Sequence, residues 1–278
     1  MRYRQGNDGA CPRVTTVVNI DIWSDVACPW CYIGKRRFDR ALASFPHRDD
    51  ITVTWHSYQL DPTLPAHDPR SEAEYLSAVK GMPVDRVREM FGHVSTQAAG
   101  EGLHYDFDTL VVANSMRAHQ LIQLARETDE KNSVKGPEEG PEEGTEKDAR
   151  SREASTVERL EEALFAAHFE QGKNIGDTGT LVALAVESGL DEDEVRQELE
   201  SGSRIPAVQA DVSRAASLGL NSVPTFVLDM KYAVPGAQPT EVFTRALEQA
   251  WEESHPQKPS FVSVNGAGNA EACGPSGC

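Results

Sequence analysis

The chain has 278 residues, of which 39% are hydrophobic and 26% charged, and its formal net charge is −17 at pH 7. This acidic balance argues against nucleic acid as a partner, because phosphate contacts with lysine and arginine supply most of the affinity for nucleic acid. No segment is long and apolar enough to span a membrane, and residues 1–14 lack the apolar core of a signal peptide. We therefore expect a cytoplasmic protein of one large or two ordinary domains without nucleic-acid or membrane partners.

The first predicted element is a β-strand over residues 15–23, where apolar and polar residues alternate. It is followed by Cys28-Pro29-Trp30-Cys31 and by a segment whose apolar residues recur at helical spacing. We expect Cys28 near the N-cap of this helix, with Pro29 at the first helical position, where its missing N–H costs nothing. Unpaired N–H groups and the positive end of the helix dipole then favour the thiolate form of Cys28.

The spacing of Cys28 and Cys31 is compatible with other roles. Two cysteines three residues apart also form half of a structural zinc site, and some such pairs are merely buried. The strand before the pair and the helix after it favour redox chemistry. In a reducing cytosol, paired thiols are more often catalytic, redox-sensing or metal-binding than structural.

The rest of the chain predicts a second strand over residues 51–58, a proline-rich loop, and then a long helical region. Apolar residues recur at helical spacing in seven segments, at about 71–79, 84–98, 109–125, 156–171, 180–188, 192–201 and 207–218. Strands are predicted at 225–228 and 232–234, and a last helix over about 239–251. This order of elements resembles that of a thioredoxin fold split by helices.

The segment Ser222–Leu228 contains a proline at the start of a strongly β-prone run. Because proline cannot donate to a sheet ladder, it belongs at a strand start, an edge or a bend, and a cis Val223–Pro224 bond would fit there. In thioredoxin-like folds a cis-proline loop packs beside the active-site cysteines and offers its backbone to an incoming polypeptide. The pairing of this segment with the upstream cysteines is therefore a much stronger signal than either alone.

Together these motifs resemble the thioredoxin-like DsbA family, and its FrnE-type members in particular. The matching residues are Ser24-Asp25-Val26, Cys28-Pro29-Trp30-Cys31-Tyr32-Ile33-Gly34, Ala118-His119, Ala163-Leu164-Phe165 with Phe169, Asn174-Ile175 with Asp177, Leu218-Gly219, Val223-Pro224-Thr225-Phe226 and Gly236-Ala237-Gln238-Pro239. The resemblance covers about residues 15–252. It implies an α/β thioredoxin fold with an all-helical insert between the N-terminal βαβ part and the C-terminal ββα part.

The resemblance also implies a domain organisation and an activity. We expect a discontinuous thioredoxin-like domain, residues 15–61 with 219–254, and a helical insert domain at 62–218. The implied activity is that of a protein-disulfide oxidoreductase or isomerase that needs no cofactor and binds no metal. Its partners would be cysteine-containing proteins, with glutathione or a thioredoxin-type protein as the recycling partner.

The motifs and the resemblance together suggest a role for each residue near the two cysteines. Cys28 would be the attacking nucleophile and Cys31 the resolving thiol. Val223 and Pro224 would position the substrate polypeptide, and Trp30 would offer it an aromatic surface. Histidines within apolar helical patterns are more often packed than catalytic, which applies to His168, whereas His119 lies in a shared motif and is the better candidate for a supporting role.

Two further segments lie outside the predicted elements. Residues 127–153 are acidic and nearly free of aliphatic residues, so we expect a disordered acidic loop within the insert. Residues 255–278 form a tail, expected to be flexible, that contains Cys273 and Cys278, which could be either an auxiliary redox pair or incidental. Cys11 has no evident role.

Two other classes of protein remain possible. The same insert-bearing fold is similar to that of kappa-class glutathione transferases and 2-hydroxychromene-2-carboxylate isomerases, which are glutathione-dependent. Those proteins typically have serine where this chain has Cys28. The third class is a zinc-binding module with Cys28, Cys31, Cys273 and Cys278 as ligands, whose spacing suits zinc poorly.

Overall fold

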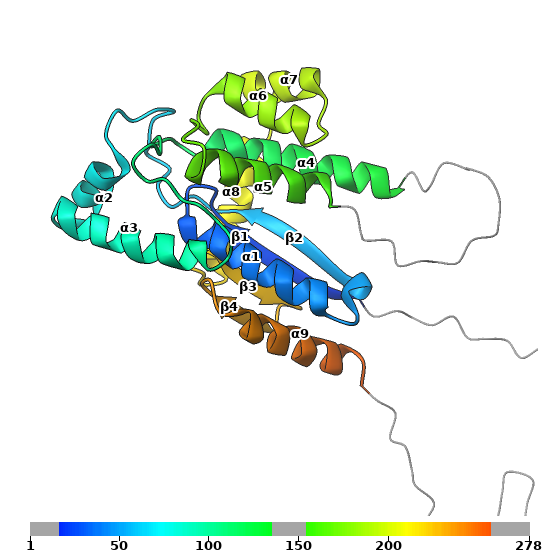
Figure 1. The fold of residues 1–278 in the computed structure, drawn as a ribbon. Helices are drawn as coiled ribbons and strands as arrows, with labels where there is room; N and C mark the ends of the chain where they lie inside the picture. The colour runs from blue at the N-terminus through cyan, green and yellow to red at the C-terminus, as the bar shows by residue number, and fades with distance from the viewer. Residues whose placement is uncertain (1–16, 135–153, 257–278) are drawn as a thin grey trace, which may run out of the picture.

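The computed structural model describes residues 17–134 and 154–256, and its centre is a four-stranded mixed sheet in the order β2-β1-β3-β4 (Figure 1). β1 (Val18–Ser24) pairs in parallel with β2 (Ile51–Ser57). β3 (Thr225–Leu228) runs antiparallel to both β1 and β4 (Tyr232–Pro235). The sheet thus joins strands from the two ends of the chain, as the thioredoxin fold requires.

One face of the sheet is covered by α1 (Pro29–Ser44) and α9 (Thr240–Ser254), which pack against each other. Phe38 of α1, Phe226 of β3 and Phe243 of α9 are all fully buried. Their ring centroids lie between 4.5 and 5.8 Å apart. Aromatic rings at such separations attract each other beyond the gain from their buried area. This cluster therefore holds α1, and with it the N-terminal turn of α1, against the sheet.

A short 3₁₀ turn, Arg48–Asp50, precedes β2, and between β2 and β3 the chain forms a series of helices (Figure 1). These helices are α2 (Glu72–Lys80), α3 (Val84–Ala99), α4 (Met116–Val134), α5 (Thr156–Phe169), α6 (Thr178–Glu187), α7 (Glu192–Ser201) and α8 (Ile205–Ser217). None of the helices in the described parts of the chain has the length and hydropathy needed to cross a bilayer. The expected α/β thioredoxin fold with helices between its two halves is confirmed, whereas the expected domain boundaries stay a prediction.

α8 covers the other face of the sheet and packs against β2 and α4. Trp23 of β1 and Val227 of β3 point to this face, where they pack around Ala215 of α8. Their neighbours in sequence, Ile22 and Phe226, point to the α1 and α9 face. The alternation of side chains along a strand therefore gives the sheet two buried faces.

The helix predicted over residues 109–125 begins only at Met116. The segment before it is irregular, and its backbone forms hydrogen bonds with the proline-rich loop: Asp68 N–H donates to the Val112 carbonyl over 2.8 Å, and Asn114 N–H to the Pro65 carbonyl over 2.9 Å. The Asn114 side-chain oxygen then accepts from Met116 N–H over 2.8 Å. This capping contact starts the helix there, since helix N-termini favour such side chains.

Residues 127–134, the first part of the predicted acidic loop, are helical instead, because α4 continues to Val134. The Asp129 carboxylate accepts from the N–H groups of Thr156 and Val157 at the start of α5. Glu127 forms an ion pair with Arg204 over 2.7 Å. These tertiary contacts stabilise the last turns of α4, which the local composition does not reveal. Residues 135–153 lie outside the described residues.

Candidate active site

Cys28 is the N-cap residue of α1 and Pro29 is the first residue of that helix. The Cys28 N–H donates to the Asp25 carbonyl over 2.9 Å, and the Cys31 N–H donates to the Cys28 carbonyl over 3.0 Å. The turn between β1 and α1 is thereby closed, with both sulfurs at the end of α1 where N–H groups lack helical partners. Both cysteines are free thiols in this structure.

The two thiols differ in their surroundings. Cys28 is 5% exposed and Cys31 only 1%. Burial, followed by the hydrogen bond and charge of the Cys28 sulfur, raises the pKa of Cys31 well above its usual range. Cys31 therefore keeps its proton at neutral pH.

The loop before β3 lies directly against Cys28. The Val223–Pro224 peptide bond is cis, and the Cys28 thiol donates to the Val223 carbonyl over 3.8 Å. A Cβ on Gly34 would lie 2.8 Å from Pro224 Cγ, so the absence of a side chain at this position permits the close approach of α1 and the loop. The loop is held from its other side by Gly236, whose N–H donates to the Pro224 carbonyl over 2.7 Å.

Asp25 holds the turn that leads to Cys28. Its carboxylate accepts from Ala27 N–H over 3.1 Å, from Leu60 N–H over 2.7 Å and from His119 Nε2 over 3.3 Å. Burial opposes ionisation of this carboxyl, but these hydrogen bonds and the neighbouring imidazole outweigh it and lower its pKa. Asp25 is therefore a buried carboxylate that ties the Cys28 turn to α4 and to the loop after β2.

Two aromatic residues flank the first turn of α1. The Tyr105 hydroxyl donates to the Pro29 carbonyl over 2.7 Å. Burial and the charge of the Cys28 sulfur raise the pKa of Tyr105, so it remains a donor. Trp30 is half-buried, and its ring centroid lies 6.1 Å from that of His93.

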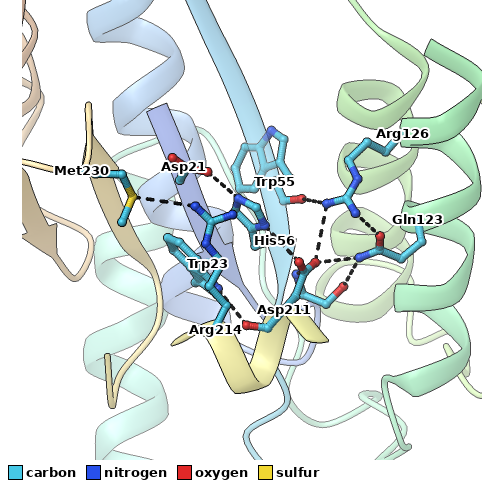
Figure 2. A network of polar contacts seen from close by, with 10 residues as sticks. Asp21, Trp23, Trp55, His56, Gln123, Arg126, Asp211, Arg214 and Met230 are labelled. Atoms are coloured by element: carbon cyan, nitrogen blue, oxygen red, sulfur yellow. Dashed lines mark hydrogen bonds and ion pairs between the residues drawn. The ribbon is translucent and has the colours of Figure 1, made fainter. Parts of the chain in front are cut away.

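A polar network on the α8 face of the sheet supports the strands that lead into the site (Figure 2). His56 Nε2 lies 2.6 Å from Asp21 Oδ1, and His56 Nδ1 lies 3.1 Å from Asp211 Oδ1. The Trp23 ring stacks on His56 at 4.4 Å and donates to the Asp211 carbonyl over 3.1 Å. Asp211 also accepts from Gln123 over 2.7 Å. The network joins β1, β2, α4 and α8.

A pocket of about 240 Å³ opens next to Cys28. Cys28 and Trp30 form one wall, and the opposite wall comes from α2 and α3. Neither Val223 nor Pro224 contributes to the lining. Cys28 therefore has the cis-proline loop on one side and this pocket on another.

The structure brings together five of the residues expected at the site: Cys28, Cys31, Trp30, Val223 and Pro224. Cys273, Cys278 and Cys11 lie outside the described residues. Within residues 17–134 and 154–256, no group of three or more histidine, cysteine, aspartate or glutamate side chains is arranged to hold a metal ion.

Sequence reasoning did not assign a role to Asp25 or Tyr105. Asp25 belongs to Ser24-Asp25-Val26, one of the motifs on which the resemblance to the DsbA family rests, and this was the signal that could have identified it. Tyr105 lies in an irregular segment with no recognisable pattern, so its contact with Pro29 becomes visible only in the fold.

The DSBA-like thioredoxin domain model matches residues 19–137 and 149–248, and the chain belongs to this family. A curated relative, the uncharacterized protein YwbO of Bacillus subtilis (strain 168), is 26% identical over 246 residues, which cover 83% of this chain and 96% of that protein. The family is one of thiol–disulfide oxidoreductases.

Two solved structures extend the comparison. A probable DsbA oxidoreductase from Streptomyces coelicolor is 37% identical, with a TM-score of 0.72, and the match covers 94% of this chain and 98% of that one. The cytosolic disulfide reductase DsbM from Pseudomonas aeruginosa, solved with GSH, is 17% identical, with a TM-score of 0.53 over 84% of this chain and 99% of that one. The second likeness concerns the fold alone.

Proposed function

We propose that this protein catalyses thiol–disulfide exchange on cysteine-containing proteins through Cys28 and Cys31. In the reducing direction, the Cys28 thiolate attacks one sulfur of a substrate disulfide, a mixed disulfide forms, and the other substrate sulfur leaves as a thiolate. Cys31 then loses its proton and attacks the Cys28 sulfur, which releases the second substrate thiol. The substrate disulfide gains two electrons and Cys28–Cys31 becomes a disulfide.

The strongest support for these roles is the unequal placement of the two thiols. Cys28 lies at the helix N-terminus and faces the Val223 carbonyl, whereas Cys31 is buried one turn further along. A substrate strand that pairs with the backbone at Val223 would bring its own cysteine to Cys28 and not to Cys31. The raised pKa of Cys31 keeps that thiol protonated, and therefore unreactive, until Cys28 is engaged.

The test of these roles uses insulin reduction with dithiothreitol. Cys28→Ser should abolish activity, and Cys31→Ser should accumulate mixed disulfides with substrate, because the resolving thiol is missing. Cys11→Ser is the matched control, since no role is proposed for Cys11, and it should retain full activity. Full activity of Cys28→Ser would refute the assignment.

We further propose a cytoplasmic enzyme of the FrnE type that glutathione or a thioredoxin-type protein recycles. The shared motifs support this proposal, and the structural likeness to DsbM, a cytosolic disulfide reductase, is consistent with it. The reduction potential of the Cys28–Cys31 pair would assign the direction. A value near the glutathione poise of about −220 to −260 mV would indicate reductase or isomerase work, and a much higher value an oxidase.

The role of Cys273 and Cys278 as an auxiliary redox pair is a separate proposal, which rests on their spacing and the glycines around them. Truncation after Glu271 should slow the reduction of protein substrates or shift the potential of the Cys28–Cys31 pair. If neither changes, the tail pair is incidental. One zinc per chain in freshly purified reduced protein, with loss of helix on chelation, would instead favour the zinc-binding alternative.

A further inference from the structure

The pocket next to Cys28 is largely apolar. Trp30 of α1, Met90 and Phe91 of α3, and Phe107 provide aromatic and thioether surface, and Leu76 of α2 completes the opposite wall. α2 and α3 pack side by side as a helical pair near the start of α1 (Figure 1). Cavities of roughly 150 Å³ with apolar walls accept benzene, so a pocket of about 240 Å³ has room for one substituted aromatic ring.

One polar side chain at this pocket has an unused hydrogen-bonding atom. His168 of α5 lines the pocket, is 2% exposed, and its Nδ1 has no hydrogen-bond partner among the described residues. Burial lowers the pKa of His168 to about 4, so the ring is neutral at pH 7. A neutral imidazole has one donor and one acceptor nitrogen, and a ligand with a neutral polar atom can satisfy either.

The acidic groups at the pocket do not favour a cationic ligand. The Asp25 carboxylate already accepts three hydrogen bonds from the protein, and Asp61 accepts from Thr63 and Tyr75. Glu72 is partly buried, and burial raises its pKa to about 7, so much of it is uncharged at neutral pH. Lys80 also lines the pocket, but it is exposed to solvent, so the buried part of the lining favours an uncharged ligand over an ion.

We propose that this pocket binds one ring of a small, uncharged aromatic disulfide, with a neutral polar atom of that ring against His168 and a sulfur against Cys28. This inference rests on the proposed function, since Cys28 would perform the exchange. The Cys28 thiolate attacks the near sulfur and releases one aromatic thiolate. Cys31 loses its proton and displaces the second thiolate from Cys28, so the disulfide is reduced by two electrons and the cysteine pair is oxidised.

A small molecule fits these observations better than a side chain of a polypeptide substrate. The cis-proline loop, where a substrate strand would pair, is no part of the pocket lining. An aliphatic side chain in the pocket would also offer the His168 imidazole no hydrogen bond, whereas a ring with a polar atom would. Polypeptide binding in the pocket is therefore the competing outcome of the test.

The test is a single turnover of the reduced full-length protein with three substrates. These are 4,4′-dithiodipyridine, which is neutral and aromatic, bis(2-hydroxyethyl) disulfide, which is neutral and aliphatic, and insulin. Met90→Trp places a larger side chain at the partly exposed rim of the pocket, and His168→Phe removes the polar atoms while keeping a ring. Val79→Trp is the matched control, because Val79 is 59% exposed on α2 and does not line the pocket.

We expect Met90→Trp and His168→Phe each to slow the aromatic substrate about tenfold relative to wild type. For His168→Phe this corresponds to the loss of one hydrogen bond. The aliphatic disulfide and insulin should stay within about twofold, and Val79→Trp should change none of the three. Because Met90 is 37% exposed, its variant keeps the test valid if His168→Phe fails to fold.

Two other outcomes overturn the proposal and are distinguishable from each other. Equal slowing of insulin and the aromatic disulfide by both variants would make the pocket a polypeptide subsite. Equal rates for both variants and wild type on all substrates would show that no substrate uses the pocket, although the Cys28 exchange would stand. If wild type reduces none of the three, the proposed function itself fails.

Discussion

Asp211→Ala should destabilise the fold by several kcal/mol, because Asp211 is the centre of the network between α8 and the sheet (Figure 2). Its carboxylate, only 10% exposed, contacts His56 at 3.1 Å, Ser57 N–H at 3.0 Å and Gln123 at 2.7 Å. Removing the carboxylate leaves the buried groups that donate to it without an acceptor, and each such group costs about 1–3 kcal/mol, so the total is several kcal/mol. For a chain of this size that corresponds to a melting temperature lower by roughly 10 °C.

The measurement is the free energy of unfolding from urea denaturation, followed by circular dichroism, with thermal melting as a second readout. Glu192→Ala is the matched control: Glu192 pairs with Arg196 over 2.7 Å, but both side chains are more than half exposed, so the loss should stay below about 1 kcal/mol. Asp211→Asn should fall between the two, because the amide still accepts from Ser57 N–H. If Asp211→Ala costs no more than Glu192→Ala, the network contributes nothing to stability.

The dependence of this effect on pH has a definite sign. Burial opposes ionisation of Asp211, but hydrogen bonds from His56 and Ser57 outweigh it and lower its pKa in the folded state. The stabilisation is therefore complete above the unfolded-state pKa of about 4 and is lost as the pH falls through the folded-state pKa. The difference in unfolding free energy between wild type and Asp211→Asn should therefore shrink as the pH falls below about 4.

Three further predictions concern the site itself. Gly34→Ala should slow insulin reduction, because the new Cβ would lie 2.8 Å from Pro224 Cγ and push the cis-proline loop from Cys28; an unchanged rate would show that the loop tolerates the shift. Tyr105→Phe should lower the unfolding free energy by about 1 kcal/mol through the lost bond to Pro29, while Cys31→Ser, which keeps that bond, serves as the comparison in the same denaturation assay. Asp25→Ala should cost more, about 3 kcal/mol, since buried N–H groups lose their acceptor, and equal losses for Asp25→Ala and Tyr105→Phe would contradict this.

The parts of the site that follow from short-range rules could be predicted from the sequence. Cys28 lies at a helix start because Pro29 follows it and apolar residues then recur at helical spacing, and these are properties of neighbouring residues. The cis bond at Pro224 also fits its local β-prone context. By contrast, the true start of α4 at Met116 depends on backbone bonds to residues 65–68, some fifty residues earlier. No local pattern contains such a contact.

The polar contacts that hold the site in place could not be predicted from the sequence for the same reason. Asp25 and His119 are 94 residues apart in sequence, and His56 and Asp211 are 155 apart. A pairing of that kind becomes recognisable only when the topology of the sheet and helices is known. The pocket was equally unpredictable, because its walls come from α1, α2, α3 and α5 and each of these helices alone looks like an ordinary amphipathic element.

In the proposed function, the cysteine pair and most of the surfaces that would meet the substrate come from different parts of the fold. Cys28 and Cys31 are fixed by β1 and α1, which belong to the thioredoxin part of the fold. Two groups of helices between β2 and β3 lie near Cys28. Residues of α2 and α3 line the pocket beside Cys28. α8, which Asp211 links to the sheet, precedes the loop that contains Val223. Changes in these helices can therefore alter which substrate approaches the sulfur without altering the cysteine pair. The pocket variants and Asp211→Ala address these two sides independently, since the first should change substrate preference and the second stability.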